Sequence, residues 1–233
     1  MQGELDLRER TWGGRREGAG RKRKPGKREP AHRARPEHKK RYPVHVSLRV
    51  VEDVGRLRRR NIYAAVRASL IARGVSGADD GGFRVVHVSI QHNHVHLLVE
   101  AGSKQALSNG MRVLTITLAR AINSSLGRSG KVFAFRYHAT TITTPAQTRN
   151  ALAYVLNNWR RHREDVLRPG SENMMVDPYS TAISFRGWRV GTELGAPADD
   201  DPLPSAEPAT WFLRVGWRAH GELDAREVPG RLR

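Results

Sequence analysis

The chain has 233 residues, contains no cysteine, and carries 41 lysines and arginines against 23 acidic residues, a formal net charge of +18. The absence of cysteine excludes a disulfide framework, a thiolate metal site and a cysteine nucleophile. Apolar stretches are only a few residues long, and none follows the basic N-terminus, so we expect no membrane span and no secretory signal. We therefore expect a cytoplasmic protein with a polyanionic partner, foremost nucleic acid, because cations that bind phosphates release condensed counterions.

The charge divides the chain into three parts. Residues 1–42 hold 15 basic and 6 acidic residues and show no apolar periodicity, which predicts a disordered basic arm. Such an arm serves either as a nucleic-acid contact or as a solubilising tail. Residues 43–165 carry a net charge of +11 and show the regular patterns of a folded domain. Residues 166–233 have a net charge of −2 and contain several tryptophans, so we expect an extension that packs on that domain.

Periodicity predicts the elements of the folded domain. Residues 44–50 alternate apolar and polar side chains, which is typical of a half-buried strand. Further strands are expected at 83–90 and 93–100, and the short link between them favours an antiparallel pair, although one bent strand would also fit. Apolar residues at helical spacing predict amphipathic helices over 52–73 and 103–126.

The last elements complete the predicted fold. Residues 132–143 favour one strand or a pair of strands, and Thr144 as N-cap with Pro145 behind it predicts a helix that continues to about Arg163. The order β-α-β-β-α-β-α predicts an α+β fold, a ferredoxin-like split βαβ sandwich with an antiparallel sheet. Two helices would cover one sheet face, and the other face would be open for a site or for the last helix.

His94 and His96 lie two residues apart in the strand predicted over 93–100. Residues i and i+2 of a strand project from the same face, so the two imidazoles lie side by side while Val95 points the other way. Two neutral imidazoles close together are suitable ligands for a divalent cation. The alternative is a pair of polar residues on a solvent-exposed face. His92 shares that face and could be a third ligand, a phosphate contact or merely exposed.

The helix predicted from Thr144 carries Tyr154 and Asn158, which are four residues apart and therefore lie on one helix face. A phenol can act as a nucleophile, and an amide oxygen is a hard ligand for a metal ion. The alternative is a half-buried tyrosine with an asparagine at its rim. Both interpretations stay open on these two residues alone.

Taken together, the two motifs resemble those of the HUH-type single-tyrosine (Y1) transposases of the IS200 kind, including the REP-associated tyrosine transposases. The resemblance is carried by Asn93-His94-Val95-His96-Leu97-Leu98 and, about sixty residues later, by Tyr154-Val155-Leu156-Asn157-Asn158. It covers roughly residues 43–165. Many relatives have proline after the last asparagine, where this chain has Trp159, a difference that affects the helix end and not the chemistry.

The resemblance implies that His94, His96 and Asn158 hold one Mg²⁺ or Mn²⁺ ion and that Tyr154, on the additional C-terminal helix, is the nucleophile. In such a reaction the tyrosine attacks single-stranded or hairpin DNA and leaves a 5′-phosphotyrosine and a free 3′-OH, which can rejoin strands without ATP. The implied function is DNA transposition by a metal-dependent, nucleoid-associated endonuclease and strand transferase, and the implied assembly includes a possible homodimer. No general base is assigned, and His92 or water are the candidates.

Cationic and aromatic side chains around the expected site are candidates for DNA contact. They are His92, Arg112, Arg120, Arg136, Tyr137, Arg160 and Arg161. Arg136 and Tyr137 could stack on and bridge a DNA strand, as guanidinium and aromatic groups do. Tyr137 is also the main rival nucleophile, but it lacks an amide partner four residues further on.

Three other functions remain open. A catalytically idle, domesticated relative would bind hairpin DNA or RNA without cutting it. A ferredoxin-like binding module would display aromatic side chains on its sheet, where this chain has histidine and valine. A metal-dependent hydrolase would act without a covalent step. A covalent adduct with single-stranded DNA would separate the transposase from all three.

Overall fold

The computed structural model describes residues 37–72, 82–167, 175–192, 194 and 201–230. The basic arm predicted over 1–42 therefore lies mostly outside the described residues.

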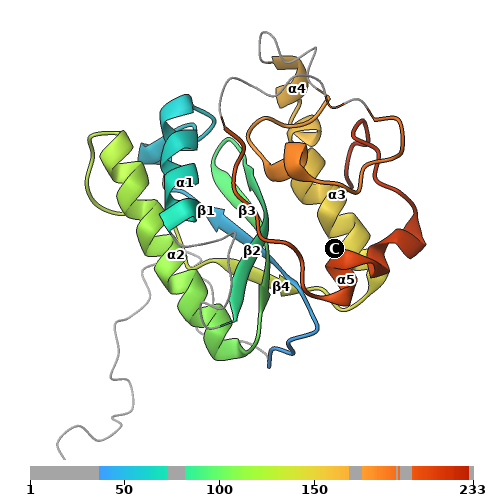
Figure 1. Cartoon of the computed structure of the whole chain (residues 1–233). Coiled ribbons are helices and arrows are strands. Elements are labelled where there is room, and N and C mark those ends of the chain that lie inside the picture. Colours follow the sequence, from blue (N-terminus) through green and yellow to red (C-terminus); the bar gives the residue numbers. More distant parts are fainter. Residues whose placement is uncertain (1–36, 73–81, 168–174, 193, 195–200, 231–233) are drawn as a thin grey trace, which may run out of the picture. The chain divides into compact units, whose positions relative to one another are not determined.

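Four strands form one antiparallel sheet in the order β2-β3-β1-β4 (Figure 1). The strands are β1 (Val44–Arg49), β2 (Phe83–Ile90), β3 (His94–Ala101) and β4 (His138–Thr141). This order is that of a split βαβ arrangement, in which the first and third strands are central. The predicted α+β, ferredoxin-like sandwich is confirmed.

Two helices cover one face of the sheet, as predicted (Figure 1). They are α1 (Arg60–Ala72) and α2 (Lys104–Ser125). Ser103 caps α2, because its side chain accepts the N–H of Ala106. The larger hydrophobic core lies between these helices and the inward-facing residues of β1, β2 and β3, among them Val46, Val88 and Leu97.

The helix predicted over 52–73 is two separate elements. A short 3₁₀ helix (Glu52–Val54) ends at Gly55, whose φ of 68° lies in the region that favours glycine. Helix α1 begins only at Arg60, so the predicted start was wrong. The link between the two elements carries Arg58, whose side chain is buried.

The strand or pair of strands predicted over 132–143 is a single, shorter strand in the structure. Only His138–Thr141 pairs with β1 as a strand, and residues 132–137 are irregular apart from an isolated bridge between Val50 and Phe133. Before the strand, the N–H of Ala134 donates to the carbonyl of Arg49, so the chain meets the end of β1 again beyond the irregular residues.

Helix α3 (Pro145–Arg161) covers the other face of the sheet (Figure 1). It begins with a capping box, in which Thr144 and Gln147 satisfy each other's backbone N–H groups, so the predicted start is confirmed. Its apolar stripe packs on Leu98 and Val86 and forms a second core. The face left open in the bare sandwich is therefore covered by the last helix of the domain.

Residues beyond α3 contact both α3 and the outer edge of β2. Their short helices are α4 (Glu164–Leu167), η2 (Thr181–Ser184), α5 (Trp211–Arg214) and η3 (Gly216–His220). Leu213, Trp217 and Leu223 lie in the second core with α3. Ser180 forms an isolated antiparallel β-bridge with Ser89 of β2. The N–H of Ala206 donates a hydrogen bond to the carbonyl of Val85 in the same strand. The edge of β2 is thus hydrogen-bonded rather than free.

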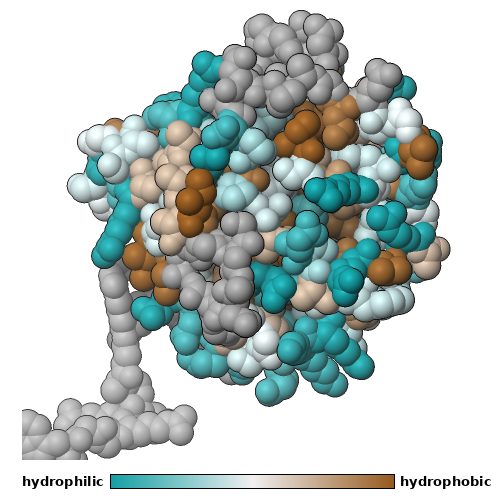
Figure 2. Space-filling view, viewed as in Figure 1, coloured by the Kyte–Doolittle hydropathy of each residue, from teal (hydrophilic) through white to brown (hydrophobic). Residues whose placement is uncertain are grey.

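The molecular face shown in Figure 2 carries its hydrophobic residues in small separate groups among hydrophilic ones. Exposed large hydrophobic side chains among the described residues are Ile71, Ile116, Phe135, Val166, Val190, Trp211, Val215 and Val228. Two of them, Ile116 and Phe135, line one cavity. No helix in the described part of the chain is long and apolar enough to cross a membrane.

Candidate active site

The alternation of β3 directs its two histidines toward α3. Val95, Leu97 and Val99 are buried in the core beneath α1 and α2, so His94 and His96 project from the opposite sheet face. Their ring centroids are 4.5 Å apart, with the rings edge to face. The sequence prediction that the two imidazoles lie side by side thus agrees with the geometry.

Helix α3 brings Tyr154 to this pair. The Tyr154 ring lies edge-on to the His96 ring, with centroids 5.0 Å apart, and its side chain is half-buried. Asn158 follows one turn later on the same helix and is fully buried. Side chains from β3 and α3, about sixty residues apart in sequence, therefore meet in one place.

His45 is a further member of the cluster that the sequence interpretation missed. It lies on β1, and its Nε2 is 3.1 Å from Nδ1 of His96. Its ring stacks on that of His96 at 5.1 Å and meets the edge of Tyr154 at 5.8 Å. The alternation of residues 44–50 indicated which side chains share a face with His45. It did not indicate that β1 pairs beside β3.

Two more polar groups border His94. The ring centroid of His162, the C-cap of α3, is 5.9 Å from that of His94. Arg49 is directly opposite His94 in the β1–β3 register. Tyr154, Asn158 and His162 are spaced four residues apart, a pattern that could have been recognised in the sequence.

Hydrogen bonds and burial prepare the histidines as ligands. His94 Nδ1 is 2.7 Å from the side-chain oxygen of Asn93, which can only accept, so Nδ1 carries the proton and Nε2 keeps its lone pair. Burial, with smaller contributions from nearby cationic groups, lowers the pKa of His94 to about 4. Burial, together with His45 and His94, also lowers the pKa of His96 well below 6.5. Both rings are therefore neutral at pH 7, the form that binds metals.

The donor atoms at this place fit a single divalent cation. His96 Nε2 and the side-chain oxygen of Asn158 are buried and have no hydrogen-bond partner among the described residues. Buried polar atoms are rarely left without a partner, so these atoms are suited to a ligand. In the described part of the chain, no three His, Cys, Asp or Glu side chains cluster as a metal site. The set available is thus two imidazoles and one amide.

Tyr154 is a protonated phenol in this environment. Burial raises its pKa above 10, while Arg161 and Asn158 act in the opposite direction. A nucleophilic role therefore requires further stabilisation of the developing charge at its oxygen.

The rival tyrosine, Tyr137, lies elsewhere. Its ring packs against the core formed with α1 and α2, and its hydroxyl oxygen is buried. It therefore belongs to the sheet face opposite Tyr154, and it is not close to the histidine pair.

The predicted DNA contacts fall into separate groups. His92 is exposed in the turn before His94. Arg160 donates hydrogen bonds to the carbonyls of Ala225 and Met175 and forms an ion pair with Asp165. These contacts occupy its guanidinium, whereas the sequence predicts that it contacts DNA. Arg161 donates a hydrogen bond to the carbonyl of Pro229, and its positive charge acts to lower the pKa of Tyr154.

The remaining candidates lie on α2 or in the segment before β4. A cavity of about 530 Å³, here named the α2 cavity, is lined by Arg112, Arg136, Tyr137, Ile116 and Phe135, together with Leu48, Ser108, Asn109, Thr115, Ala119 and Phe133. The structure thus brings three of the predicted DNA contacts together. Arg120 is exposed on the same helix but does not line the cavity.

Comparison with protein families gives one decisive match. The family model described as "Transposase IS200 like" matches residues 54–158, a span that includes both histidines of β3 and both Tyr154 and Asn158. Residues 54–158 belong to the IS200-like transposase family. A comparison with curated proteins finds no match.

A solved structure supports the fold of this IS200-like transposase region. A REP-associated tyrosine transposase bound to a REP hairpin aligns with a TM-score of 0.52 and 14% identity, over 77% of this chain and 98% of that chain. A Deinococcus radiodurans R1 protein assigned as a transposase aligns with a TM-score of 0.34 and 13% identity, over 59% of this chain and 96% of that chain. At 14% identity the first likeness shows the fold alone, and at a TM-score of 0.34 the second carries no argument.

Proposed function

We propose that this protein nicks and rejoins single-stranded DNA through a 5′-phosphotyrosine on Tyr154, in a transposase-like reaction. The observation that carries the proposal is the approach of the Tyr154 ring to the buried His96, with centroids 5.0 Å apart. A nucleophile beside a pair of metal-ligating groups is what phosphodiester cleavage by a tyrosine needs. The family of residues 54–158 supports the same conclusion.

His94, His96 and Asn158 would hold the divalent cation, Mg²⁺ or Mn²⁺. The two imidazoles are neutral because burial lowers the pKa of each, and the amide oxygen of Asn158 has no other partner among the described residues. When bound, such a cation supplies Lewis-acid polarisation of the scissile phosphate. Tyr154 needs such assistance, because burial raises its pKa and an unassisted phenol is a poor nucleophile at pH 7.

The proposed step exchanges one phosphodiester for another. The phenolic oxygen of Tyr154 loses its proton and forms a bond to phosphorus. The bond from phosphorus to the 3′ oxygen of the preceding nucleotide breaks, and that oxygen takes up a proton and leaves as a 3′-OH. Attack of a 3′-OH on the phosphotyrosine reverses the same bonds, so strands are rejoined without ATP.

The DNA partner is proposed to contact two surfaces. Beside the site, His92 and Arg49 are exposed near His94. The α2 cavity offers Phe135 for stacking and Arg136 for phosphate contact, the combination that suits unpaired bases. The hairpin bound by the REP-associated relative supports a hairpin substrate here. All four proposed site residues come from one chain, and a homodimer stays a prediction.

The decisive experiment traps the covalent intermediate. Hairpin and single-stranded oligonucleotides with Mg²⁺ or Mn²⁺ are expected to yield a protein–DNA adduct that survives denaturing electrophoresis, with the DNA on the peptide that contains Tyr154. Tyr154→Phe should bind DNA like the parent and give no adduct, whereas Tyr137→Phe should still react. An adduct on Tyr137 would reassign the nucleophile. DNA binding by the parent without any adduct would favour the catalytically idle relative.

A further inference from the structure

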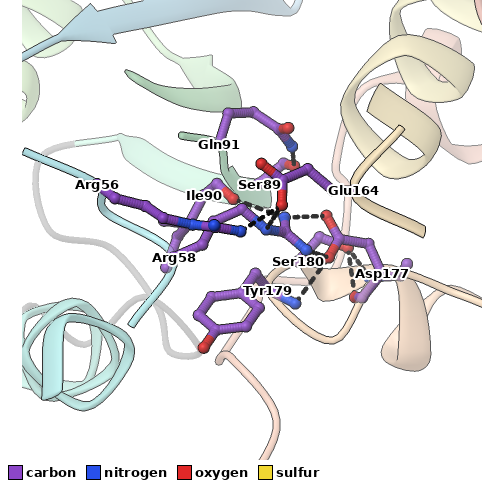
Figure 3. A network of polar contacts seen from close by, with 10 residues as sticks. Arg56, Arg58, Ser89, Ile90, Gln91, Glu164, Asp177, Tyr179 and Ser180 are labelled. Atoms are coloured by element: carbon purple, nitrogen blue, oxygen red, sulfur yellow. Dashed lines mark hydrogen bonds and ion pairs between the residues drawn. The ribbon is translucent and has the colours of Figure 1, made fainter. Parts of the chain in front are cut away.

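A buried ionic network lies next to the proposed site (Figure 3). At its centre is Arg58, whose side chain is only 1% exposed. Its Nη1 and Nη2 donate to the two carboxylate oxygens of Asp177 at 3.0 and 2.8 Å, and Asp177 is itself fully buried. Such a two-bond pair fixes the geometry of both partners, not only their distance.

The same guanidinium reaches the strand that precedes the histidines. Nη1 of Arg58 donates to the carbonyl of Ile90 at 2.9 Å. Ile90 is the last residue of β2, and the following N–H, of Gln91, donates to the carbonyl of His94. The neighbouring N–H of Leu57 donates to the carbonyl of His92. The link 55–59 thus holds both ends of the turn that leads into His94.

Arg58 also reaches the short helix that follows the tyrosine-bearing helix. Its Nε lies 3.6 Å from the carboxylate of Glu164, which begins α4 directly after α3 and also binds Arg56. In Figure 3 the Arg58 guanidinium points between Glu164 and Asp177, over the ring of Tyr179. One side chain therefore contacts the end of β2, the start of α4 and Asp177 of the C-terminal extension, and these segments lead directly to β3 and from α3.

We propose that Arg58 is a positioning residue through which Asp177 of the C-terminal extension fixes His94 and His96 of β3 relative to Tyr154 and Asn158 of α3. The inference rests on the proposed function and gives the extension a part in it. Asp177 lies outside residues 54–158, so the extension supplies a support that the family region does not contain. A small displacement of reacting groups reduces a rate steeply, by roughly 100-fold for about 1 Å.

The test compares three variants of the full-length protein. Arg58→Lys keeps the charge and loses the two-bond geometry. The double variant Arg58→Met with Asp177→Leu replaces the buried pair by apolar side chains, a change that can preserve the fold. Arg189→Gln removes the exposed pair with Asp224, also in the extension, and is the matched control. Circular dichroism and thermal unfolding establish that each variant is folded.

Two readouts separate positioning from folding. With a hairpin oligonucleotide at saturating concentration, the folded Arg58 variants are expected to form adduct about 10- to 100-fold more slowly, with unchanged oligonucleotide affinity. Calorimetric titration with Mn²⁺ alone should show weaker binding in the same variants and parental binding in Arg189→Gln. A folded double variant with parental adduct rate and Mn²⁺ affinity would overturn the inference. If the parent forms no adduct, the proposed function fails, and the Mn²⁺ titration still decides the role of Arg58.

Discussion

Nε2 of His45 and Nδ1 of His96 are 3.1 Å apart on the two central strands of the sheet. One of these nitrogens must carry the proton that the other accepts. If His96 donates, its remaining nitrogen, Nε2, keeps the lone pair that a cation needs, and Nε2 of His96 is the atom that lacks a partner among the described residues. We therefore expect His45 to act as an outer support that orients His96, the proposed metal ligand.

Replacing His45 should weaken metal binding without removing a ligand. We expect His45→Phe, which keeps a ring and loses the acceptor, to lower Mn²⁺ affinity by roughly 10- to 100-fold. His45→Gln, which can still accept a hydrogen bond, should lose less. Isothermal titration with Mn²⁺ measures the difference, and equal affinities for the two variants would contradict the hydrogen-bonding role.

Loss of a ligand should be more severe than loss of its support. His94→Ala and His96→Ala are each expected to abolish adduct formation, because one imidazole cannot hold the cation alone. Asn158→Ala should retain part of the activity, since a water molecule can replace one oxygen ligand. His220→Ala, which removes an exposed histidine of η3, is the matched control. Full adduct formation by both histidine variants in metal-containing buffer would disprove the assignment.

The buried histidines predict loss of stability in mild acid. Burial lowers the pKa of His45 and of His87 to about 4, below the 6.5 of an unfolded histidine. Between these values the unfolded chain binds protons that the folded chain does not, so the free energy of unfolding falls as pH decreases from 6.5 towards 4. For each of these two histidines, the free energy of unfolding should be about 2 kcal/mol lower at pH 5 than at pH 7.

Urea unfolding at pH 7 and pH 5 measures this effect. His87→Gln should unfold with a smaller difference between the two pH values than the parent, because one of the titrating groups is removed. His92→Gln, which changes an exposed histidine, should behave like the parent. An identical pH dependence in His87→Gln would show that His87 does not contribute.

The α2 cavity should contribute to DNA affinity and not to chemistry. Phe135→Ala removes a half-exposed ring that can stack on a base, an interaction of about 1–3 kcal/mol. We expect fluorescence anisotropy with a labelled hairpin to show a corresponding loss of affinity, while the adduct rate at saturating DNA is unchanged. Val190→Ala, which shortens another exposed apolar side chain, is the control. Unaltered affinity in Phe135→Ala would remove the cavity from the DNA interface.

Deletion of residues 1–36 should reduce the salt dependence of DNA binding while nicking persists. The cut preserves His38, whose ring nitrogen Nε2 bonds to the carbonyl of Ala101. The slope of log K against log salt should fall by about 0.7 for each phosphate of single-stranded DNA that the arm neutralises in the parent. A full-length variant in which residues 21–24 are all replaced by glutamine tests the effect of the arm's charge at constant chain length. An unchanged slope would identify the arm as a solubilising tail.

The sequence predicts local elements well because their signals are local. Alternation indicated β1, and the Thr144–Pro145 pair indicated the start of α3. The spacing of Tyr154 and Asn158 placed both on one helix face, which the structure confirms. The helix break at Gly55 was missed because the apolar spacing continues across it.

Non-local pairing could not be predicted in the same way. His45 reaches His96 only because β1 pairs with β3 in one register, and a shift by one residue would turn His45 to the other face. The contact of Arg58 with Asp177 joins residues 119 positions apart, and nothing in either local pattern indicates it. Arg160 resembled a DNA contact because its hydrogen bonds to the extension are invisible in sequence.

The hydrogen bonds that cover the edge of β2 have a consequence for how this protein can be divided. A fragment that stopped after α3 would expose the backbone groups of β2 now bonded to Tyr179 and Ala206, together with the apolar surface under Trp217. An exposed strand edge recruits other strands, so we expect such a fragment to self-associate. A shortened form of this protein therefore has to retain the chain through residue 230.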